Sequence, residues 1–499
     1  AGAALGGTAV TDAARAALFG KAVEQASEIE ADVAGAIPDW LNGTWYGNGG
    51  ADYTGMQHLF DGYGMICRFR IAGGRVHGNQ RFVQSDVFKH HEKTGKLLRR
   101  EFGTAAKEGS SAGASVMAAA TMMAQMATGQ KFATDNANVN VVPLPDGSLL
   151  AISEPSEAAY RLDGTTLDTL GQPAFLNDDV PGTLVTAHPK VLSDGTLVNF
   201  TQSFPFGGLH VYKQDPVTLK RTSIAFIKSR DPLAPSWVHD FAVTDDYVVI
   251  VEPPIHFNMA GALVDAQGPF MDWRPSAGTR VHVVPLQPGA PQRMFTAPSM
   301  LFFHTANAFV QDGHLNVDIA AYDSVRILLE DLTIQQLRSN PGRDVTKSSM
   351  RRLRMPLSPS APSALPAPVQ LIGDDAAHGS YVEFTSVSPA VRGRRHRYVW
   401  GTCAARPTNV GNALCKLDIE AGAVAATWHA PGCLPSEPVF VPRPGGQDED
   451  DGAVLSVVMG ADGRSFLLVL DGRTFAELAR AHVPYAVPNR FHTSFAPMA

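Results

Sequence analysis

Four histidines in strand-like surroundings are the residues of this chain whose type and spacing could carry out chemistry. His188, His239, His304 and His492 follow one another at intervals of 51, 65 and 188 residues. An imidazole among apolar neighbours is tolerated only when it is hydrogen-bonded or bound to a metal. One such residue is most often a satisfied core histidine, but four in matching settings indicate a metal site. The wide spacing argues against a local zinc motif, which usually takes two ligands from one turn or helix. An all-imidazole ligand set suits Fe(II), Cu, Zn or Ni alike.

Carboxylates should support such a site. Four neutral imidazoles leave the full positive charge on a divalent metal, and each ring has a second nitrogen whose N–H needs an acceptor. Glu154, Glu383 and Glu437 lie in strand-like settings and are candidates for this role. Taken singly, each could equally be an ordinary surface or edge residue.

The elements that position these residues read as β-structure. Around His239, strand-like runs flank a Thr-Asp-Asp turn at 244–246, which predicts a β-hairpin. Because neighbours along a strand point to opposite faces, Trp237 and His239 should share one face and Val238 should occupy the other. From Gly43 onward, short β-rich runs alternate with turns, many of them Asp-Gly pairs. This pattern suits a β-propeller better than a sandwich, and inner strands of a propeller converge on one axis.

Three segments depart from this pattern. Residues 1–35 are Ala-rich and predict an N-terminal helical extension, with Thr11 as a helix N-cap, ahead of a main domain at 36–499. Helical inserts are predicted at about 105–130 and at 323–351. The first contains the uncharged stretch Ser110–Gly129, which suits an interfacial helix or, equally, a Met-rich core or lid helix.

The overall composition narrows the possible functions. Of the 499 residues, 44% are apolar. The formal charge of −7 gives no electrostatic reason to bind nucleic acid. The four cysteines form no close pair and are expected to be reduced thiols in an intracellular compartment. The acidic run at 447–451 lies between turn glycines and is expected to be a solvated loop.

The order of motifs resembles that of the carotenoid cleavage oxygenases from Pro38 to Phe495. Asn42-Gly43-Thr44 and the following His58-Leu59-Phe60-Asp61-Gly62 are similar to the opening blade of that family, and the settings of the four histidines are similar to its iron-ligand motifs. The resemblance implies a seven-bladed, all-β propeller with a helical or loop dome over the metal face. It also implies a non-haem Fe(II) ion held by His188, His239, His304 and His492, with Glu154, Glu383 and Glu437 behind them. Thr493 departs from the family pattern, which commonly has glycine after the last histidine.

The implied activity is the cleavage of one double bond of a carotenoid or apocarotenoid with O2. No catalytic side chain is expected beyond the metal centre. An apolar tunnel would choose the bond, and Trp237, Phe302, Phe303 and Phe491 are candidates to line it, with ordinary core packing as the alternative for each. Peripheral membrane contact through Ser110–Gly129 and Phe257–Phe270 would deliver the substrate.

A narrower resemblance points to the plant carlactone-forming branch of the family. Its motifs are Phe60–Tyr63, Thr134–Asn138, Arg406–Asn409 and Pro435–Gly445. This resemblance implies a β-apo-10′-carotenal substrate cleaved around carbons 13 and 14 in strigolactone synthesis. It implies location in the plastid stroma with peripheral membrane association, the cytoplasm being the alternative. Three other functions stay open: cleavage of a different carotenoid or apocarotenoid bond, a hydrolase or isomerase using the same site, and a non-catalytic carotenoid-binding scaffold.

Overall fold

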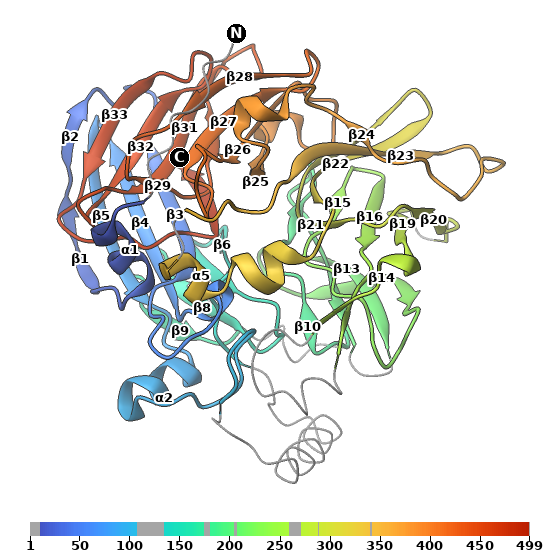
Figure 1. The fold of residues 1–499 in the computed structure, drawn as a ribbon, viewed down its shortest axis with the longest axis horizontal. Helices are drawn as coiled ribbons and strands as arrows, with labels where there is room; N and C mark the ends of the chain where they lie inside the picture. Colours follow the sequence, from blue (N-terminus) through green and yellow to red (C-terminus); the bar gives the residue numbers. More distant parts are fainter. Residues whose placement is uncertain are drawn as a thin grey trace.

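The computed structural model describes residues 10–106, 134–173, 180–203, 207–258, 271–287, 289–339 and 342–498. Seven antiparallel sheets of four to six strands follow one another along the chain, and a separate two-stranded hairpin accompanies them. The sheets are the blades of a β-propeller, as predicted (Figure 1). We letter the blades A to G in chain order.

Blades A to D use the central part of the chain. Blade A contains β6 (Asn140–Pro143), β7 (Ser148–Ile152), β8 (Ala159–Asp163) and β9 (Thr169–Gly171). Blade B contains β10 (Leu184–Val185), β11 (Lys190–Val191), β12 (Leu197–Gln202), β13 (Gly208–Gln214) and β14 (Arg221–Lys228). Blade C contains β15 (Ala242–Val243), β16 (Tyr247–Glu252), β19 (Thr279–Pro285) and β20 (Arg293–Ala297). Blade D contains β21 (Leu301–Gln311), β22 (His314–Tyr322), β23 (Ser349–Pro356) and β24 (Val369–Gln370).

Blades E to G bring the two ends of the chain together. Blade E contains β25 (Val382–Ser386), β26 (Tyr398–Cys403), β27 (Ala413–Asp418) and β28 (Ala423–Trp428). Blade F contains β29 (Leu434–Pro435), β30 (Val439–Pro442), β31 (Gly452–Met459), β32 (Ser465–Asp471), β33 (Glu477–His482) and the early strand β2 (Asp32–Gly35). Blade G contains β34 (His492–Pro497), β3 (Gly43–Gly50), β4 (Gly64–Ala72), β5 (Arg75–Phe82) and β1 (Gln25–Glu30).

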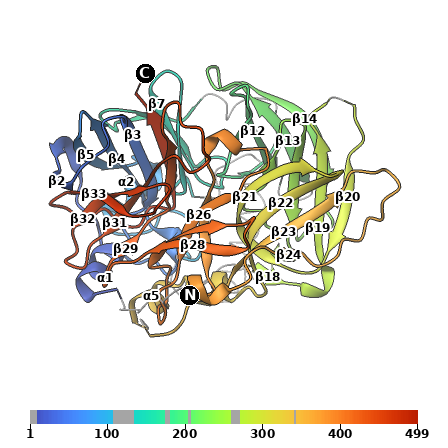
Figure 2. The same cartoon turned by 90° about the horizontal axis from the view of Figure 1, so that it is seen from above.

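Pairing between the first and last strands closes the ring. The C-terminal β34 pairs with β3 from Gly43↔Pro497 to Asn48↔His492, and β2 pairs with β33. In Figure 2 the blue N-terminal strands and the red C-terminal strands accordingly lie side by side. The closure is made by main-chain hydrogen bonds, so the ring does not depend on a bound ligand for its continuity.

The hydrophobic core is divided among the contacts between neighbouring blades. In β16, Val248 and Ile250 pack in the cluster shared with blade B, whereas Val249 and Val251 pack in the cluster shared with blade D. Successive strand residues point to opposite faces, and here both faces are covered by another blade. The middle strands therefore read as continuous apolar runs, and β31 is buried along its whole length.

The N-terminal segment differs from the predicted helical extension. Its helix is α1 (Asp12–Phe19), and Thr11 caps it as predicted by accepting a hydrogen bond from the Ala14 N–H. Residues 25–35 instead form the edge strands β1 and β2. Edge strands are held by main-chain pairing to one neighbour and need few apolar side chains. Their polar sequence therefore did not indicate strands.

Short helices and turns lie in the loops that join the strands, most of them within one blade. They are α2 (Asp86–Thr94), α5 (Ile334–Ser339), the π-helical turn η4 (Ile327–Asp331) and the 3₁₀ turns η1 (Leu59–Asp61), η3 (Pro275–Ala277), η5 (Asp375–His378) and η6 (Pro389–Val391), with the hairpin β17 (Ile255–Phe257) and β18 (Met271–Trp273). Within its described residues, the insert predicted at 323–351 is helical at η4 and α5 only, and β23 begins at Ser349.

The expected interfacial stretch Ser110–Gly129 lies outside the described residues, as does most of 257–270, so membrane contact there stays a prediction. Among the helices that the structure describes, none is long and apolar enough to cross a membrane. All four cysteines are free and buried, consistent with the reduced thiols expected from the sequence.

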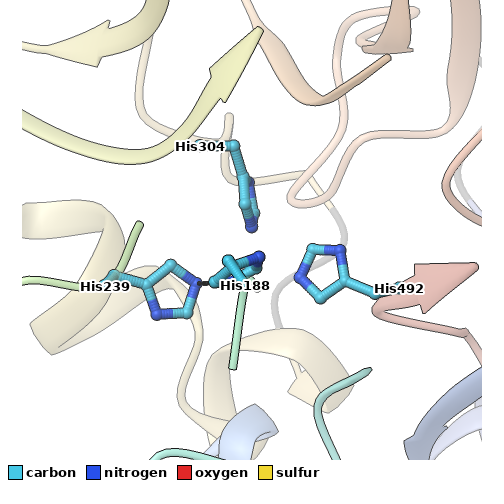
Figure 3. A group of neighbouring side chains, drawn as sticks. All are labelled: His188, His239, His304 and His492. Carbon is cyan, nitrogen blue, oxygen red and sulfur yellow. Dashed lines mark hydrogen bonds between the residues drawn. The ribbon is translucent and has the colours of Figure 1, made fainter. Parts of the chain in front are cut away.

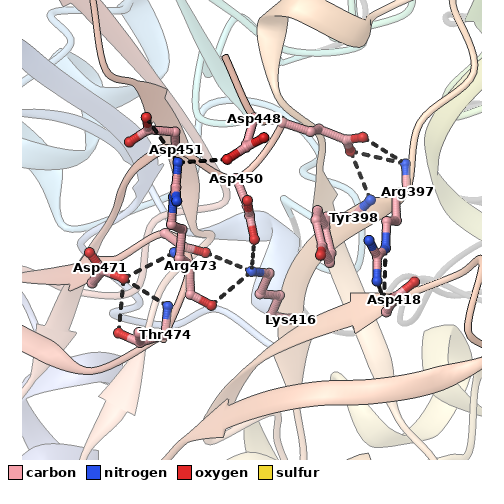
Figure 4. Close-up of polar contacts among 12 residues, drawn as sticks. Arg397, Tyr398, Lys416, Asp418, Asp448, Asp450, Asp451, Asp471, Arg473 and Thr474 are labelled. Carbon is pink, nitrogen blue, oxygen red and sulfur yellow. Dashed lines mark hydrogen bonds and ion pairs between the residues drawn. The ribbon is translucent and has the colours of Figure 1, made fainter. Parts of the chain in front are cut away.

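The acidic run at 447–451 is bonded to its surroundings (Figure 4). Glu449 accepts hydrogen bonds from the main-chain N–H groups of Arg397 and Tyr398, at 2.8 and 2.7 Å, and Asp450 accepts one from Lys416 at 2.5 Å. Lys416 also donates to two carbonyls that follow β32, and Arg473 pairs with Asp448. We call residues 447–451 with Arg397, Lys416 and Arg473 the acidic clamp. It joins blade E to blade F, so the expectation of a merely solvated loop was incomplete.

Candidate metal centre

The four histidines lie at the edge of blades B, C, D and G that faces the common axis. His304 belongs to β21 and His492 begins β34. His188 lies between β10 and β11, and His239 lies three residues before β15. Each of these strands is at an end of its sheet, and Figure 3 shows the four rings directed toward one point.

The ring nitrogens converge closely enough to hold one ion. One nitrogen from each ring lies within 4.8 Å of the others, and all four residues are buried. The Nε2 atoms of His188 and His239 are 3.1 Å apart. Two metal–nitrogen bonds of about 2.1 Å at a right angle place their nitrogens about 3 Å apart, so this separation suits two ligands of one ion.

Three of the histidines are held by glutamates through their other nitrogen. Nδ1 of His239 lies 2.6 Å from Glu154, Nδ1 of His304 lies 2.5 Å from Glu383, and Nδ1 of His492 lies 3.0 Å from Glu437. A carboxylate accepts the Nδ1–H and thereby leaves the Nε2 lone pair free to bind a metal. Glu154 follows a strand of blade A, and Glu383 and Glu437 belong to blades E and F. The three blades that supply no histidine therefore supply the glutamates.

His188 is positioned differently. No carboxylate is hydrogen-bonded to its ring among the residues that the structure describes. Its main-chain N–H donates to the hydroxyl of Thr186, and that hydroxyl donates to the carbonyl of His239 at 2.5 Å. Thr186 thus joins the backbones of two of the converging histidines.

A buried aspartate connects the residues that follow three of these histidines. Asp240 comes directly after His239, and its carboxylate accepts hydrogen bonds from both the N–H and the hydroxyl of Thr305, each at 2.7 Å. It also pairs with Lys190 at 2.6 Å. Sequence reasoning missed this residue, although its position next to a candidate ligand was visible.

The electrostatics of the site favour neutral imidazoles. Burial, followed by the neighbouring histidines, lowers the pKa of His188 and of His304 well below the ordinary value. Burial raises the pKa of Glu383 to about 8. A divalent cation would oppose that last shift because it favours the charged carboxylate.

A metal fits these residues on two observations. The Nε2 of His304 is buried and has no hydrogen-bond partner among the described residues. An unpaired buried ring nitrogen is costly, and a metal at the convergence point would use its lone pair. The donor set, four imidazoles backed by three carboxylates, is also one that transition metals accept.

Thr493 takes part in the support of the last histidine. Its N–H and its hydroxyl both donate to the second oxygen of Glu437, at 2.6 and 3.1 Å. The residue that departs from the family pattern therefore adds a hydrogen bond that glycine could not make.

Comparison with known proteins identifies the family. Residues 19–497 match the family model described as retinal pigment epithelial membrane protein. This chain belongs to the carotenoid cleavage oxygenases. It is 33% identical over 480 residues to "Carotenoid cleavage dioxygenase 8 homolog B, chloroplastic" of Oryza sativa subsp. japonica, covering 93% of this chain and 82% of that relative. It is also 33% identical over 487 residues to the Arabidopsis thaliana "Carotenoid cleavage dioxygenase 8, chloroplastic", covering 94% and 84%.

Solved structures agree with this assignment. The cobalt-substituted apocarotenoid oxygenase of Synechocystis superposes with a TM-score of 0.80 at 25% identity, covering 98% of both chains. A variant of the same oxygenase superposes with a TM-score of 0.79 at 26% identity. This carotenoid cleavage oxygenase is therefore an oxygenase enzyme with the seven-bladed fold of its neighbours.

An apolar cavity of about 260 Å³ opens beside three of the four histidines of the oxygenase. Phe303 and Phe491 line it, together with His239, His304 and His492. Phe302 points the other way and packs in the core between blades C and D, as the alternation along β21 requires. Trp237 packs beside His239, with ring centroids 5.2 Å apart, and its indole N–H donates to Glu154. Val238 belongs to a different core cluster, so the two faces predicted for this segment are confirmed.

Phe60 is one of the cavity-lining aromatic residues that sequence reasoning left unassigned. It lies parallel to the ring of His239 at 6.5 Å and makes edge contacts with Phe303 at 6.0 Å and Phe491 at 5.8 Å. Its place in the His58–Gly62 motif was the available signal. Phe60 thus brings the 3₁₀ turn η1 of blade G onto the cavity wall.

Proposed function

We propose that this oxygenase is an Fe(II)-dependent dioxygenase that cleaves one double bond of an apocarotenal with O2. The observation that carries the proposal is the apolar cavity lined by three of the four converging imidazoles. A rigid polyene needs an elongated apolar site, and an iron held by four imidazoles would have coordination positions left for O2.

His188, His239, His304 and His492 would hold the iron, and Glu154, Glu383 and Glu437 would hold three of those rings in the ligating tautomer. Bound iron would supply the activation of O2. The side chains of this chain do the rest by placement: Phe60, Phe303 and Phe491 present ring faces and edges to the polyene and exclude water. No side chain needs to act as an acid or a base, because both products are carbonyl compounds formed by oxygen addition.

The substrate that we propose is a β-apo-10′-carotenal cleaved around carbons 13 and 14. Support comes from the two chloroplastic relatives at 33% identity and from the motifs at 60–63, 134–138, 406–409 and 435–445. The word chloroplastic in the names of these relatives also supports a place in the plastid, and the same motifs support a place in strigolactone synthesis.

Incubation of the iron-loaded protein with cis and trans β-apo-10′-carotenal under 18O2 tests the proposal. We expect two carbonyl products, identified by mass spectrometry, that carry the label. Product without label would instead support an isomerase or hydrolase, and binding without any product would support a carotenoid-binding scaffold. His239→Ala serves as the control that lacks one imidazole.

A further inference from the structure

One wall of the cavity is polar, in contrast to the aromatic walls around the histidines. The polar residues on it are Arg100, Glu101, Thr134, Asn136, Asn138 and Ser153. The asparagines are already engaged: the side-chain amides of Asn136 and Asn138 donate to main-chain carbonyls in the 60–62 turn. Ser153 donates to Asn138. These three residues shape the wall and have little hydrogen-bonding capacity left for a ligand.

Glu101 differs from them. The residue lines the cavity although it is only 3% exposed. Thr134 donates to Oε1 at 2.8 Å, and the N–H of Glu101 donates to the carbonyl of Thr104. The amide of Asn136 also lies within hydrogen-bonding reach of this carboxyl, but its two hydrogens are directed at the carbonyls of Asp61 and Gly62.

The protonation state of Glu101 determines what it can offer. Burial, and next the nearby carboxylate of Asp61, raise the pKa of Glu101 well above its ordinary value. A neutral carboxyl carries one O–H donor in addition to its acceptors. Thr134 is paired with Oε1 as the donor, and among the described residues no hydrogen bond is made to the second carboxyl oxygen, Oε2. A buried donor without an acceptor is costly, and a ligand in the cavity can supply the acceptor.

We propose that Glu101 is a specificity-determining residue that donates a hydrogen bond to the carbonyl oxygen of the substrate. The proposal rests on the function proposed above and names the polar end of the substrate that the cavity recognises. Glu101 and the converging histidines line the same cavity, so an anchored carbonyl would fix which double bond of a rigid polyene lies at the metal. A carbonyl suits this site because it accepts hydrogen bonds without adding a further donor.

Binding to the wild-type protein gives the first test and needs no substitution. The ligands are β-apo-10′-carotenal and the hydrocarbon of the same polyene length in which a methyl group replaces the aldehyde. Tryptophan fluorescence quenching measures both dissociation constants. We expect the carotenal to bind about 10-fold more tightly, the effect of one hydrogen bond made in a buried site. Equal binding would overturn the proposal.

Two variants locate the effect at residue 101. Glu101→Met removes the donor at similar size and should weaken carotenal binding about 10-fold while leaving the hydrocarbon unchanged. Glu101→Gln keeps an N–H donor and should stay within about 3-fold of the wild type for both ligands. Equal weakening of both ligands by Glu101→Met would show a structural role and overturn the proposal, as would unchanged carotenal binding.

The absorption of the bound carotenal supplies a spectroscopic readout. A hydrogen bond to a conjugated carbonyl shifts the polyene absorption to longer wavelength, so the shift should be present in the wild type and Glu101→Gln and absent in Glu101→Met. Turnover separates this proposal from the one on which it rests. A wild-type protein that cleaves no carotenal contradicts the proposed function, whereas cleavage at an unchanged bond in Glu101→Met contradicts only the role of Glu101.

Discussion

The metal centre and the acidic clamp both depend on acidic side chains, but they use them in different ways. At the centre, three glutamates from three blades each hold one imidazole, and their sequence positions are far apart. In the clamp, neighbouring residues of one loop bind a buried lysine and two main-chain N–H groups across the contact of blades E and F. Figure 3 shows the four rings directed toward a shared point, whereas Figure 4 shows acidic side chains bonded to basic side chains and main-chain N–H groups.

This contrast shows that the local density of acidic residues does not indicate which of them support the metal centre. The run at 447–451 has the higher local charge, yet its carboxylates are satisfied by protein partners and strengthen the ring. The three glutamates do not stand out in the sequence. Each nevertheless orients an imidazole whose other nitrogen has a lone pair available for a metal. Substitutions in the two regions should therefore separate metal binding from stability.

The largest effect is expected from removing an imidazole. His239→Ala should leave almost no iron bound per chain and abolish product formation, because the ion loses a ligand and Glu154 loses its ring partner. Metal analysis of the purified protein measures the loss. The circular dichroism spectrum should stay that of the wild type, and retention of full iron content would contradict the assignment of His239 as a ligand.

The next largest effect should come from the clamp, and on stability alone. Lys416 is 2% exposed and donates to Asp450 and to the carbonyls of Gly472 and Arg473. Lys416→Met should lower the free energy of unfolding by about 3–5 kcal/mol, because it leaves a partly buried carboxylate without its cation. Urea denaturation measures this change. The iron content per folded molecule should not change. A lower iron content would contradict the separation of metal binding from stability in the two regions.

Neutralising a glutamate of the centre should have an intermediate effect. Glu383→Gln keeps an acceptor for the Nδ1–H of His304 but removes the negative charge that strengthens it as a ligand. We expect iron affinity or activity to fall about 10–100-fold. A competitive chelator titration gives the affinity, and the unfolding curve should move little. An affinity equal to that of the wild type would argue against a supporting role for Glu383.

The smallest effect is expected at Thr493. Thr493→Val preserves shape and the main-chain hydrogen bond to Glu437 but removes the hydroxyl that also donates to it. The loss of one such bond, about 0.5–1.5 kcal/mol, should weaken iron binding by no more than about 10-fold. The same chelator titration compares this variant with Thr493→Ser, which keeps the hydroxyl and should behave like the wild type.

Much of the architecture could be predicted from local patterns. The alternation of short apolar runs with Asp-Gly turns indicated a propeller, and Thr11 marked the start of the only N-terminal helix among the described residues. The strands β1 and β2 were missed because edge strands are stabilised by main-chain pairing with partners distant in sequence, which side-chain patterns do not encode.

For the site, the types of residue in the sequence were informative, but the sequence did not reveal the direction in which each side chain points. The four histidines and three glutamates were selected because of their chemistry, and they lie together in the structure. Phe302 and Phe303 were equivalent candidates, and only the facing of β21 directs Phe303 into the cavity and Phe302 into the core. Phe60, Glu101 and Asp240 were not selected, because the roles argued for them depend on neighbours that come from other blades.

The sequence by itself determined the kinds of groups available: imidazoles spaced by whole blades, acidic residues, and strands apolar on both faces. The tertiary structure alone decided which of these groups meet. Closure of the ring by β34 and β3 brings His492 to residues hundreds of positions earlier, and it places an acceptor from another blade beside each of three rings. The reason is physical: hydrogen bonds and metal coordination act over about 2–3 Å, so they depend on spatial position and not on distance along the chain.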